Sequence, residues 1–245
     1  MERQITFCLL FLLLLSSTVS AAPTVLEYAP AEGATWTIKS KTVAKVPMLG
    51  TKTYELSYDM TCLGQSGDLF SMRLDVPAIT ADNGQTFGPV EATFKLSPTG
   101  QVSALSSPQM NDPQIASVLK NVGLLFPKLP GTAVNVGEAW TSREVFYLPA
   151  AAARHNRKKA PKLPDKVRLD ATFKFVKLDA AKGAQVSAVL KHASGEPIKV
   201  DFKGSGYHKP EVGYGTGASF GGNIKVRKLL MWVTVPITVT SWLDE

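Results

Sequence analysis

The stretch Val167-Arg168-Leu169-Asp170-Ala171-Thr172-Phe173-Lys174-Phe175 has an apolar residue at every second position and a polar residue between. Successive side chains of a β-strand point to opposite faces of a sheet, so this period of two predicts a strand with one buried face. Similar alternation recurs at residues 54–62, 70–76, 92–96, 198–202 and 231–239. Half-buried strands are typical of antiparallel sheets. The sequence therefore predicts a mainly β fold, an antiparallel curved sheet that forms a half-barrel or a sandwich.

One central segment has helical periodicity instead. Its apolar side chains recur three or four positions apart, at Ile115, Val118, Leu119, Val122 and Leu125. Asn111 or Asp112 can cap this helix ahead of Pro113, because a proline at the first helical position has no amide hydrogen to leave unpaired. Pro127 and Pro130 are expected to end it. The pattern predicts one amphipathic helix, which either packs on the sheet or forms a lid over a cavity.

The chain on either side of this helix carries matching motifs. Gly33-Ala34-Thr35-Trp36-Thr37 and Gly137-Glu138-Ala139-Trp140-Thr141 both read G-x-x-W-T. A second motif, G-x-x-Φ-S-x-x-L with Φ apolar, begins at Gly67 and again at Gly183. Two motifs in the same order predict an internal duplication. We expect a first β half at residues 23–110, a helix and proline-rich connection at 111–132, and a second β half at 133–245.

Residues 1–22 have the pattern of a secretory signal peptide. Arg3 precedes an apolar run, and small residues up to Ala22 offer a cleavage site. The apolar run has about half of the ~20 residues that a membrane-spanning helix needs, which disfavours an uncleaved anchor. We expect export to the periplasm or the extracellular space. Removal of the signal leaves Cys62 as the single cysteine, on the apolar side of a predicted strand, where we expect it to be buried.

The composition is that of a folded protein with one strongly basic segment. Apolar residues make up 44% and charged residues 19% of the chain, which excludes a disordered protein, and the formal net charge is +7. A predicted insert at residues 150–168 holds seven basic residues and one acidic residue, Asp165, the basic ones being Arg154, Arg157, Lys158, Lys159, Lys162, Lys166 and Arg168. The insert is either a solvated loop or a contact site for an anionic membrane or glycan. It lacks the interleaved aromatics of nucleic-acid grooves, and we predict no nucleic-acid partner.

Motifs for catalysis and metal binding are poorly matched. Gly217-Ala218-Ser219-Phe220-Gly221 fits the G-x-S-x-G nucleophile elbow of hydrolases, but that elbow needs a following helix and a later histidine. A strand-like stretch follows Ser219, and the three histidines, His155, His192 and His208, all precede it. Their spacing matches no metal-binding motif. We predict no catalytic residues, no metal and no cofactor.

The start of the second half carries a family resemblance. The proline-rich turn Phe126-Pro127-Lys128-Leu129-Pro130-Gly131 leads to Val136-Gly137-Glu138-Ala139-Trp140. In this the chain resembles a family of uncharacterised bacterial secreted or envelope β-proteins, whose second half opens with such a turn and V-G-x-x-W. The resemblance implies export and a duplicated β fold, and it carries no catalytic residues. In plan, the expected sheet and helix are similar to half-barrel carriers of lipoproteins and lipids, where they enclose an apolar cavity.

These observations support three functional hypotheses. The first is a non-enzymatic envelope protein that binds a lipid or another apolar or amphiphilic ligand between sheet and helix. Its expected binding residues are Trp36, Trp140, Ile115, Leu119 and Val122. The second is a structural or adhesion-like protein that docks on an anionic membrane or glycan through the basic insert. The third is a hydrolase, which only the motif around Ser219 favours.

Overall fold

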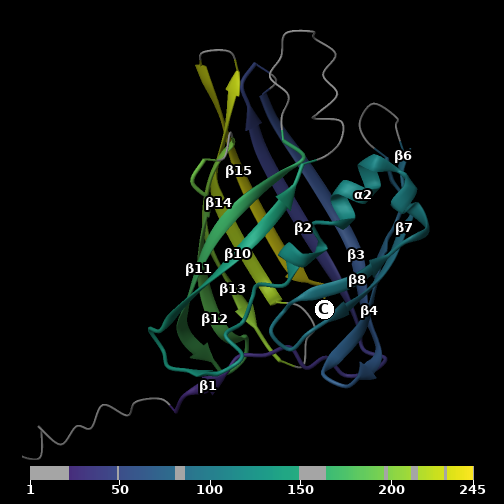
Figure 1. The fold of residues 1–245 in the computed structure, drawn as a ribbon, viewed down its shortest axis with the longest axis vertical. Helices are drawn as coiled ribbons and strands as arrows, with labels where there is room; N and C mark the ends of the chain where they lie inside the picture. Colours follow the sequence, from purple (N-terminus) through teal and green to yellow (C-terminus); the bar gives the residue numbers. More distant parts are fainter. Residues whose placement is uncertain are drawn as a thin grey trace, which may run out of the picture.

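Antiparallel pairing of the alternating strands builds one large sheet. The computed structural model describes residues 22–48, 50–80, 86–148, 164–195, 198–210, 215–228 and 231–244. Within these residues, eleven strands pair in the order β10-β11-β12-β13-β14-β15-β2-β3-β4-β7-β8. Figure 1 shows that the sheet curves into a half-barrel. The predicted mainly β, half-barrel fold is confirmed, whereas residues 1–21 of the predicted signal peptide lie outside the described residues.

The strands of the sheet come from both sides of the central helix. The first half contributes β2 (Thr35–Val46), β3 (Gly50–Ser66), β4 (Leu69–Val76), β7 (Val90–Leu96) and β8 (Val102–Ser106). The second half contributes β10 (Ala139–Tyr147), β11 (Lys166–Asp179), β12 (Gly183–His192), β13 (Ile198–His208), β14 (Gly215–Lys228) and β15 (Met231–Leu243). Two short ribbons pair β1 (Thr24–Val25) with β9 (Ala133–Val134) and β5 (Ile79–Thr80) with β6 (Thr86–Phe87).

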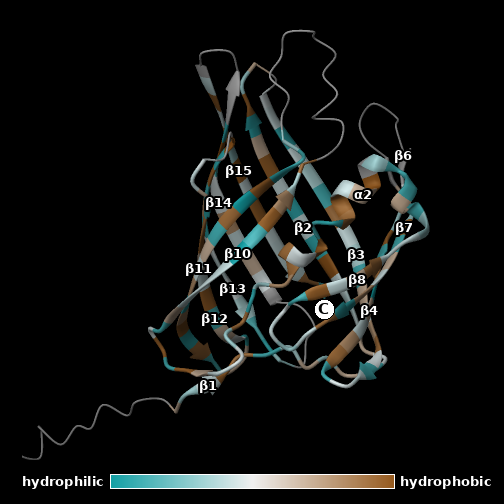
Figure 2. Ribbon diagram, viewed as in Figure 1, coloured by the Kyte–Doolittle hydropathy of each residue, from teal (hydrophilic) through white to brown (hydrophobic). Residues whose placement is uncertain are grey.

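The alternation along each strand decides which face is buried. In β11, the apolar residues of the period-two pattern are all buried and the intervening polar residues are all exposed. Figure 2 shows hydrophobic and hydrophilic residues alternating along the strands. Buried residues of β2, β3, β4, β7, β11 and β12 form one core together with Leu119 and Phe126 of the central connection. Cys62 is fully buried in that core, as predicted.

The last strand joins the two halves into one sheet. β15 pairs with β14 on one side and with β2 on the other, where Ser241 lies opposite Ser40 and Leu243 opposite Ile38. Ladder hydrogen bonds therefore run without interruption from β10 to β8. Neither half is a separate sheet, and the inner face of the half-barrel is shared between them.

The two halves repeat the same local geometry before and after their first hairpin. The Gly33 N–H donates to the Cys62 carbonyl (2.8 Å), and the Gly137 N–H donates to the Phe175 carbonyl (2.7 Å). The register then shifts immediately after Cys62 and after Phe175, as expected for a β-bulge. Trp36 and Trp140 are each the second residue of their strands, β2 and β10, and they consequently occupy corresponding positions in the two halves.

The second shared motif is out of register. Met72 lies opposite Cys62 and Val186 lies opposite Phe175, so Met72 corresponds to Val186. The match between the two motifs instead aligns Phe70 with Val186, and Phe70 is two residues before Met72. The hairpin of the second half is longer, and this difference displaces the motif. The internal duplication itself stays a prediction.

The central helix is shorter than its periodicity predicts. It begins at Pro113 as expected, and the Asp112 Oδ1 accepts the Ile115 N–H (3.3 Å). The expectation of one helix up to Leu125 is wrong, because the connection contains η1 (Pro108–Asn111), α2 (Pro113–Leu119) and η2 (Val122–Leu125). The break occurs at Asn121.

The Asn121 side chain explains the break. Its Nδ2 donates to the Tyr147 carbonyl (2.7 Å) and its Oδ1 accepts the Tyr147 N–H (2.7 Å). The amide thus pairs with the backbone of β10, an edge strand whose outer N–H and C=O groups have no neighbouring strand. Further along, the Trp140 Nε1 donates to the Lys128 carbonyl (2.6 Å). Residues 121–128 therefore cover the edge of β10, and the helical turns lie across the open side of the half-barrel (Figure 1).

An N-terminal strap, residues 24–33, crosses one end of the half-barrel. Its residues Leu26 and Tyr28 are buried in the hydrophobic core. The Tyr28 N–H donates to the Pro98 carbonyl (2.8 Å) in the first half, and the Ala29 N–H donates to the Pro210 carbonyl (2.7 Å) in the second. The strap thus ties the two halves at the end where β1 lies in Figure 1. Of the helices in the described ranges, none has the length and apolar character needed to span a membrane.

The Asn121 contact makes a testable contribution to stability. We expect Asn121→Ala to lower the free energy of unfolding by about 1–3 kcal/mol, because it leaves the Tyr147 N–H and C=O without partners. Urea denaturation measures this change. Asn111→Ala, at an exposed position of the same connection, is the control and should have a smaller effect. Equal effects of the two substitutions would show that the amide pair contributes nothing.

Candidate ligand cavity

A cavity of about 220 Å³ lies between the inner face of the sheet and η2. The central connection contributes Leu124, Leu125, Phe126, Pro127 and Leu129 to its lining. The apolar lining residues of the sheet are Phe173, Val186, Ala188, Leu190, Phe220 and Val239. Most of the surface that a ligand would contact is therefore aliphatic or aromatic.

The cavity exists because small residues form a row across four strands. Gly206 of β13 lies opposite Ala218 of β14, Ala218 opposite Ser241 of β15, and Ser241 opposite Ser40 of β2. All four residues line the cavity. A Cβ atom at Gly206 would lie only 3.1 Å from the Ala218 Cβ, so the strands approach closely here. Small side chains on a strongly curved inner face leave volume that larger side chains would fill.

Next to this row, an aromatic ring covers a glycine. Gly204 of β13 lies opposite Phe220 of β14. A Cβ atom at Gly204 would come within 2.5 Å of the Phe220 ring, so only glycine fits. Gly204 and Gly206 lie within paired strands, with a register shift between Tyr207 and His208, and the backbones of β13 and β14 approach closely at Gly204.

The N-terminal strap closes one end of the cavity. Tyr28 and His208 both line the cavity, and their rings meet edge to face with centroids 4.9 Å apart. The Tyr28 hydroxyl donates to the Pro127 carbonyl (3.1 Å), and the His208 Nε2 donates to the Glu27 carbonyl (2.8 Å). These bonds hold the two rings between the strap, the end of β13 and the proline-rich turn.

Among the described residues that line the cavity, Glu144 is the one carboxylate. It lies on β10 opposite Leu169, whose side chain is buried on the inner face. Its Oε1 accepts a hydrogen bond from the Ser142 hydroxyl (2.7 Å). Burial lowers the pKa of the nearby Lys128, and the negative charge of Glu144 acts in the opposite direction. The Lys128 ammonium donates to the Gly100 carbonyl.

The residues predicted to bind a ligand surround this cavity without lining it. Leu119 and Val122 are buried in the core, and Ile115 and Trp36 are partly buried against it. Trp140 stacks on the cavity-lining Phe173, with centroids 5.8 Å apart and planes 22° from parallel. The lining segment of the connection starts at Gly123, one residue after Val122, the last predicted contact. Sequence periodicity pointed to the helical face, whereas the cavity lies beneath η2 and the turn after it.

Most of the predicted basic site lies outside the described residues, which exclude Arg154, Arg157, Lys158, Lys159 and Lys162. The other two members, Lys166 and Arg168, are exposed on β11. The Arg168 carbonyl accepts the Ala193 N–H (2.9 Å) just after the end of β12, so this part of the basic segment belongs to the sheet.

The residues of the hydrolase-like and metal-binding candidates have ordinary structural positions. Ser219 is exposed within β14, between Ser205 and Thr240 of the neighbouring strands, and a strand continues after it. His192 is half-buried, with its Nδ1 3.2 Å from the Val200 carbonyl oxygen. Across the described part of the chain, no three His, Cys, Asp or Glu side chains gather in a way that could hold a metal ion.

Comparison with known protein families and with curated proteins gave no match. Among solved structures, the chain is similar to lipovitellin, in a structure described as "Lipid-protein interactions in lipovitellin", with a TM-score of 0.50 and 8% sequence identity. The similarity covers 89% of this chain and 26% of that chain, so the chain spans about a quarter of lipovitellin. DynF from the dynemicin biosynthesis pathway of Micromonospora chersina matches with a TM-score of 0.23, 9% identity and coverage of 92% and 87%, too low to support a conclusion. The lipovitellin likeness concerns the fold alone.

The lowered pKa of Lys128 predicts a specific pH dependence. Between that lowered pKa and the ordinary value of 10.5, the unfolded chain binds the Lys128 proton more tightly than the folded chain. The free energy of unfolding therefore rises with pH in this window, through this group. We expect wild type to gain stability relative to Lys128→Met as the pH is raised from neutral to 10.5, measured by denaturant titration. A stability difference that stays constant with pH would contradict this prediction.

A second variant tests the cause. Glu144→Gln removes the charge that raises the pKa of Lys128. We expect the pH-dependent gain to begin at a lower pH in this variant than in wild type. An unchanged onset would show that the two side chains do not interact.

Proposed function

We propose that the protein is an exported, non-enzymatic binding protein that holds the apolar part of a lipid or another amphiphile in the half-barrel cavity. The observation that carries this proposal is the cavity of about 220 Å³, with its mostly apolar lining, beneath η2. Transfer of apolar surface from water contributes about 25 cal/mol per Å² buried, so such a lining favours an apolar ligand. Engineered apolar cavities of about 150 Å³ stay dry and bind benzene.

Two further observations support the proposal. One solved structure of similar fold, that of lipovitellin, is described by its lipid–protein interactions. The pattern of residues 1–22 is that of a secretory signal peptide, which supports export to the periplasm or the extracellular space.

Filling the cavity tests this function. Ala218 lines the cavity, and the adjacent Ser219 is exposed on the other face of β14. We expect wild type to bind the neutral fluorescent probe N-phenyl-1-naphthylamine, and Ala218→Leu to weaken that binding at least about tenfold, because the added side chain occupies the ligand volume. Fluorescence titration measures both affinities.

Ser219→Leu is the matched control, since it adds the same side chain one position away on the outer face. It should bind the probe as wild type does. Thermal unfolding of both variants checks that they fold. Equal probe affinity in Ala218→Leu and wild type would place the binding site elsewhere, and absence of probe binding to wild type would remove the proposal.

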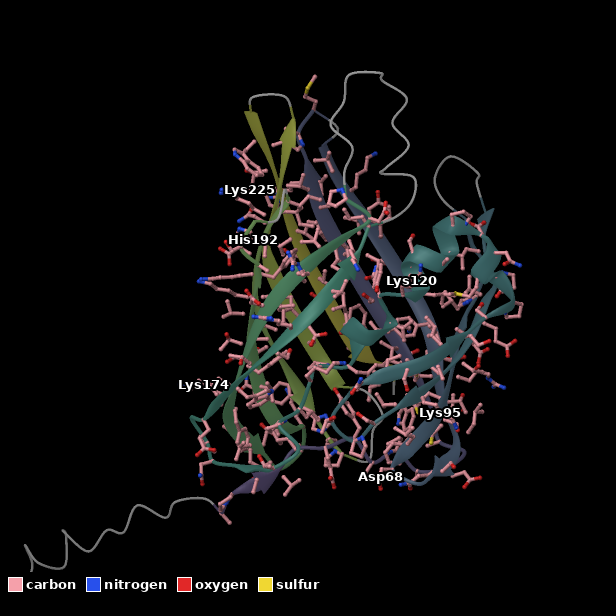
Figure 3. All side chains as sticks on the ribbon, in the orientation of Figure 1. Asp68, Lys95, Lys120, Lys174, His192 and Lys225 are labelled. Atoms are coloured by element: carbon pink, nitrogen blue, oxygen red, sulfur yellow. The ribbon has the colours of Figure 1, made fainter. Side chains whose placement is uncertain are left out.

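A second candidate function, docking on an anionic membrane, is favoured by the lysines on the outer face of the second half. We call Lys191, Lys199, Lys203 and Lys225 the convex lysine face; all four are exposed. Lys199 and Lys225 lie directly opposite each other on β13 and β14. Like charges in opposite positions destabilise a sheet, and an anionic surface would relieve that repulsion. Figure 3 shows Lys225 and Lys174 along the outer margin of this half.

An exposed aromatic ring adjoins these lysines. The Lys199 Nζ lies 4.7 Å from the centroid of the Trp232 ring, and Trp232 is 40% exposed. Tryptophan is enriched at the interface between membrane and water, where its ring meets the head groups. Lysines around an exposed tryptophan therefore suit an anionic phospholipid surface.

Neutralising two of these lysines tests the docking function. Each lysine near an anionic membrane contributes about 1 kcal/mol, so Lys199→Gln/Lys225→Gln should weaken binding to phosphatidylglycerol vesicles about 30-fold, measured by co-sedimentation. Lys45→Gln/Lys52→Gln removes the same charge from the first half and should have little effect. Equal losses in both variants would show an effect of net charge only. Binding to heparin without binding to vesicles would indicate a glycan partner.

A further inference from the structure

We propose that the ligand carries a positively charged head group that binds Glu144, so the cavity selects cationic amphiphiles over fatty acids. This inference rests on the proposed ligand-binding function of the cavity. It depends on where Glu144 lies, on the absence of lysine and arginine among the described lining residues, and on the hydrogen bonds that the neighbouring side chains make.

Glu144 lies on the side of the cavity nearest the covering connection. It belongs to the edge strand β10, between Trp140 and Tyr147, the two residues that tie β10 to the connection. Between the two contacts of the connection with β10, the chain forms η2. Gly123, Leu124 and Leu125 of η2 line the cavity together with Glu144. The carboxylate is thus part of the boundary between the apolar interior and the covering turn. A ligand with its tail inside the cavity would have its head group at that boundary.

The other polar groups of the described lining are neutral hydroxyls or already have partners. Tyr28 and His208 bind the Pro127 and Glu27 carbonyls. Ser40, Ser241, Tyr58 and Tyr207 carry hydroxyl groups. The Glu144 carboxylate therefore provides the charge that a ligand head group meets inside the cavity.

The nearby lysine does not supply a competing cationic site in the cavity. Lys128 is not among the lining residues, although Pro127 and Leu129 on either side of it are. Its ammonium donates to the Gly100 carbonyl, in the turn between β7 and β8. A fatty-acid carboxylate in the cavity would meet the like charge of the half-buried Glu144, and the mostly apolar lining makes this repulsion stronger than it is in water. An ammonium group would instead form a charge-assisted hydrogen bond.

The hydroxyl of Ser142 positions the carboxylate. Because it donates to Oε1, it holds the side chain in one orientation. A carboxylate offers about four lone-pair sites on two oxygens, so it can accept from Ser142 and from a ligand at the same time. The geometry fits one donor from the protein and one from the head group.

Competition among matched amphiphiles tests this selectivity. Dodecylammonium, dodecanol and dodecanoate share one alkyl chain and differ in head-group charge, and each is used to displace N-phenyl-1-naphthylamine from the full chain below its micelle concentration. We expect wild type to prefer dodecylammonium to dodecanoate at least about tenfold, the size expected for a charged hydrogen bond. Glu144→Gln should abolish that preference and leave dodecanol affinity unchanged.

Two more variants keep the test decisive. Glu144→Lys should reverse the order, with dodecanoate bound more tightly than dodecylammonium. Glu91→Gln, which removes an exposed carboxylate on β7, should retain the wild-type order. Thermal unfolding with and without dodecanol checks that each variant still folds and binds.

The outcomes separate this inference from the proposed function. If all three amphiphiles displace the probe equally from wild type, or if Glu144→Gln keeps the wild-type preference, the role of Glu144 is overturned while ligand binding stands. If wild type binds neither the probe nor any of the amphiphiles, the ligand-binding function fails, and the selectivity fails with it.

Discussion

The pairing of the Asn121 side chain with the backbone of Tyr147 is the contact on which the covered half-barrel depends. A curved sheet that does not close has two edge strands, β8 and β10, whose outer N–H and C=O groups need partners. The Asn121 amide supplies both partners at one residue of β10, and Trp140 anchors the same connection further along. These bonds hold η2 over the inner face. Without them, the cavity would be an open concave surface.

The second constraint is the size of the side chains on that inner face. Gly206, Ala218, Ser241 and Ser40 form a row across four strands, while Phe173 and Phe220 both belong to the adjacent row on one side of it. Well-packed protein interiors leave few voids larger than a water molecule. The small row therefore accounts for a cavity beside the core that contains Met60 and Phe126. The proposed function depends on the volume that the inner face leaves empty and on Glu144 at its boundary.

Much of the fold could be predicted, because period-two alternation is a local property of each strand. Val167 to Phe175 alternate in the sequence as they alternate between core and solvent, and the Asp112 cap marks the start of α2. The end of the helix could not be predicted. Val122 and Leu125 continue the helical spacing, but α2 ends at Leu119, just before Asn121 bonds to the backbone of Tyr147, 26 residues away. Helical periodicity therefore pointed to Ile115, Leu119 and Val122 as ligand contacts, whereas the lining begins at Gly123.

The sequence by itself determined the strands, their buried faces, the start of the central helix and the burial of Cys62, since each follows from residues close together in the chain. Only the tertiary structure decided the pairing of β15 with β2, the row of small residues and the inward position of Glu144. Ser40 and Ser241 are 201 positions apart, and nothing local to either serine marks it as part of a cavity. An empty volume belongs to no single segment, because it forms only when distant strands curve around it.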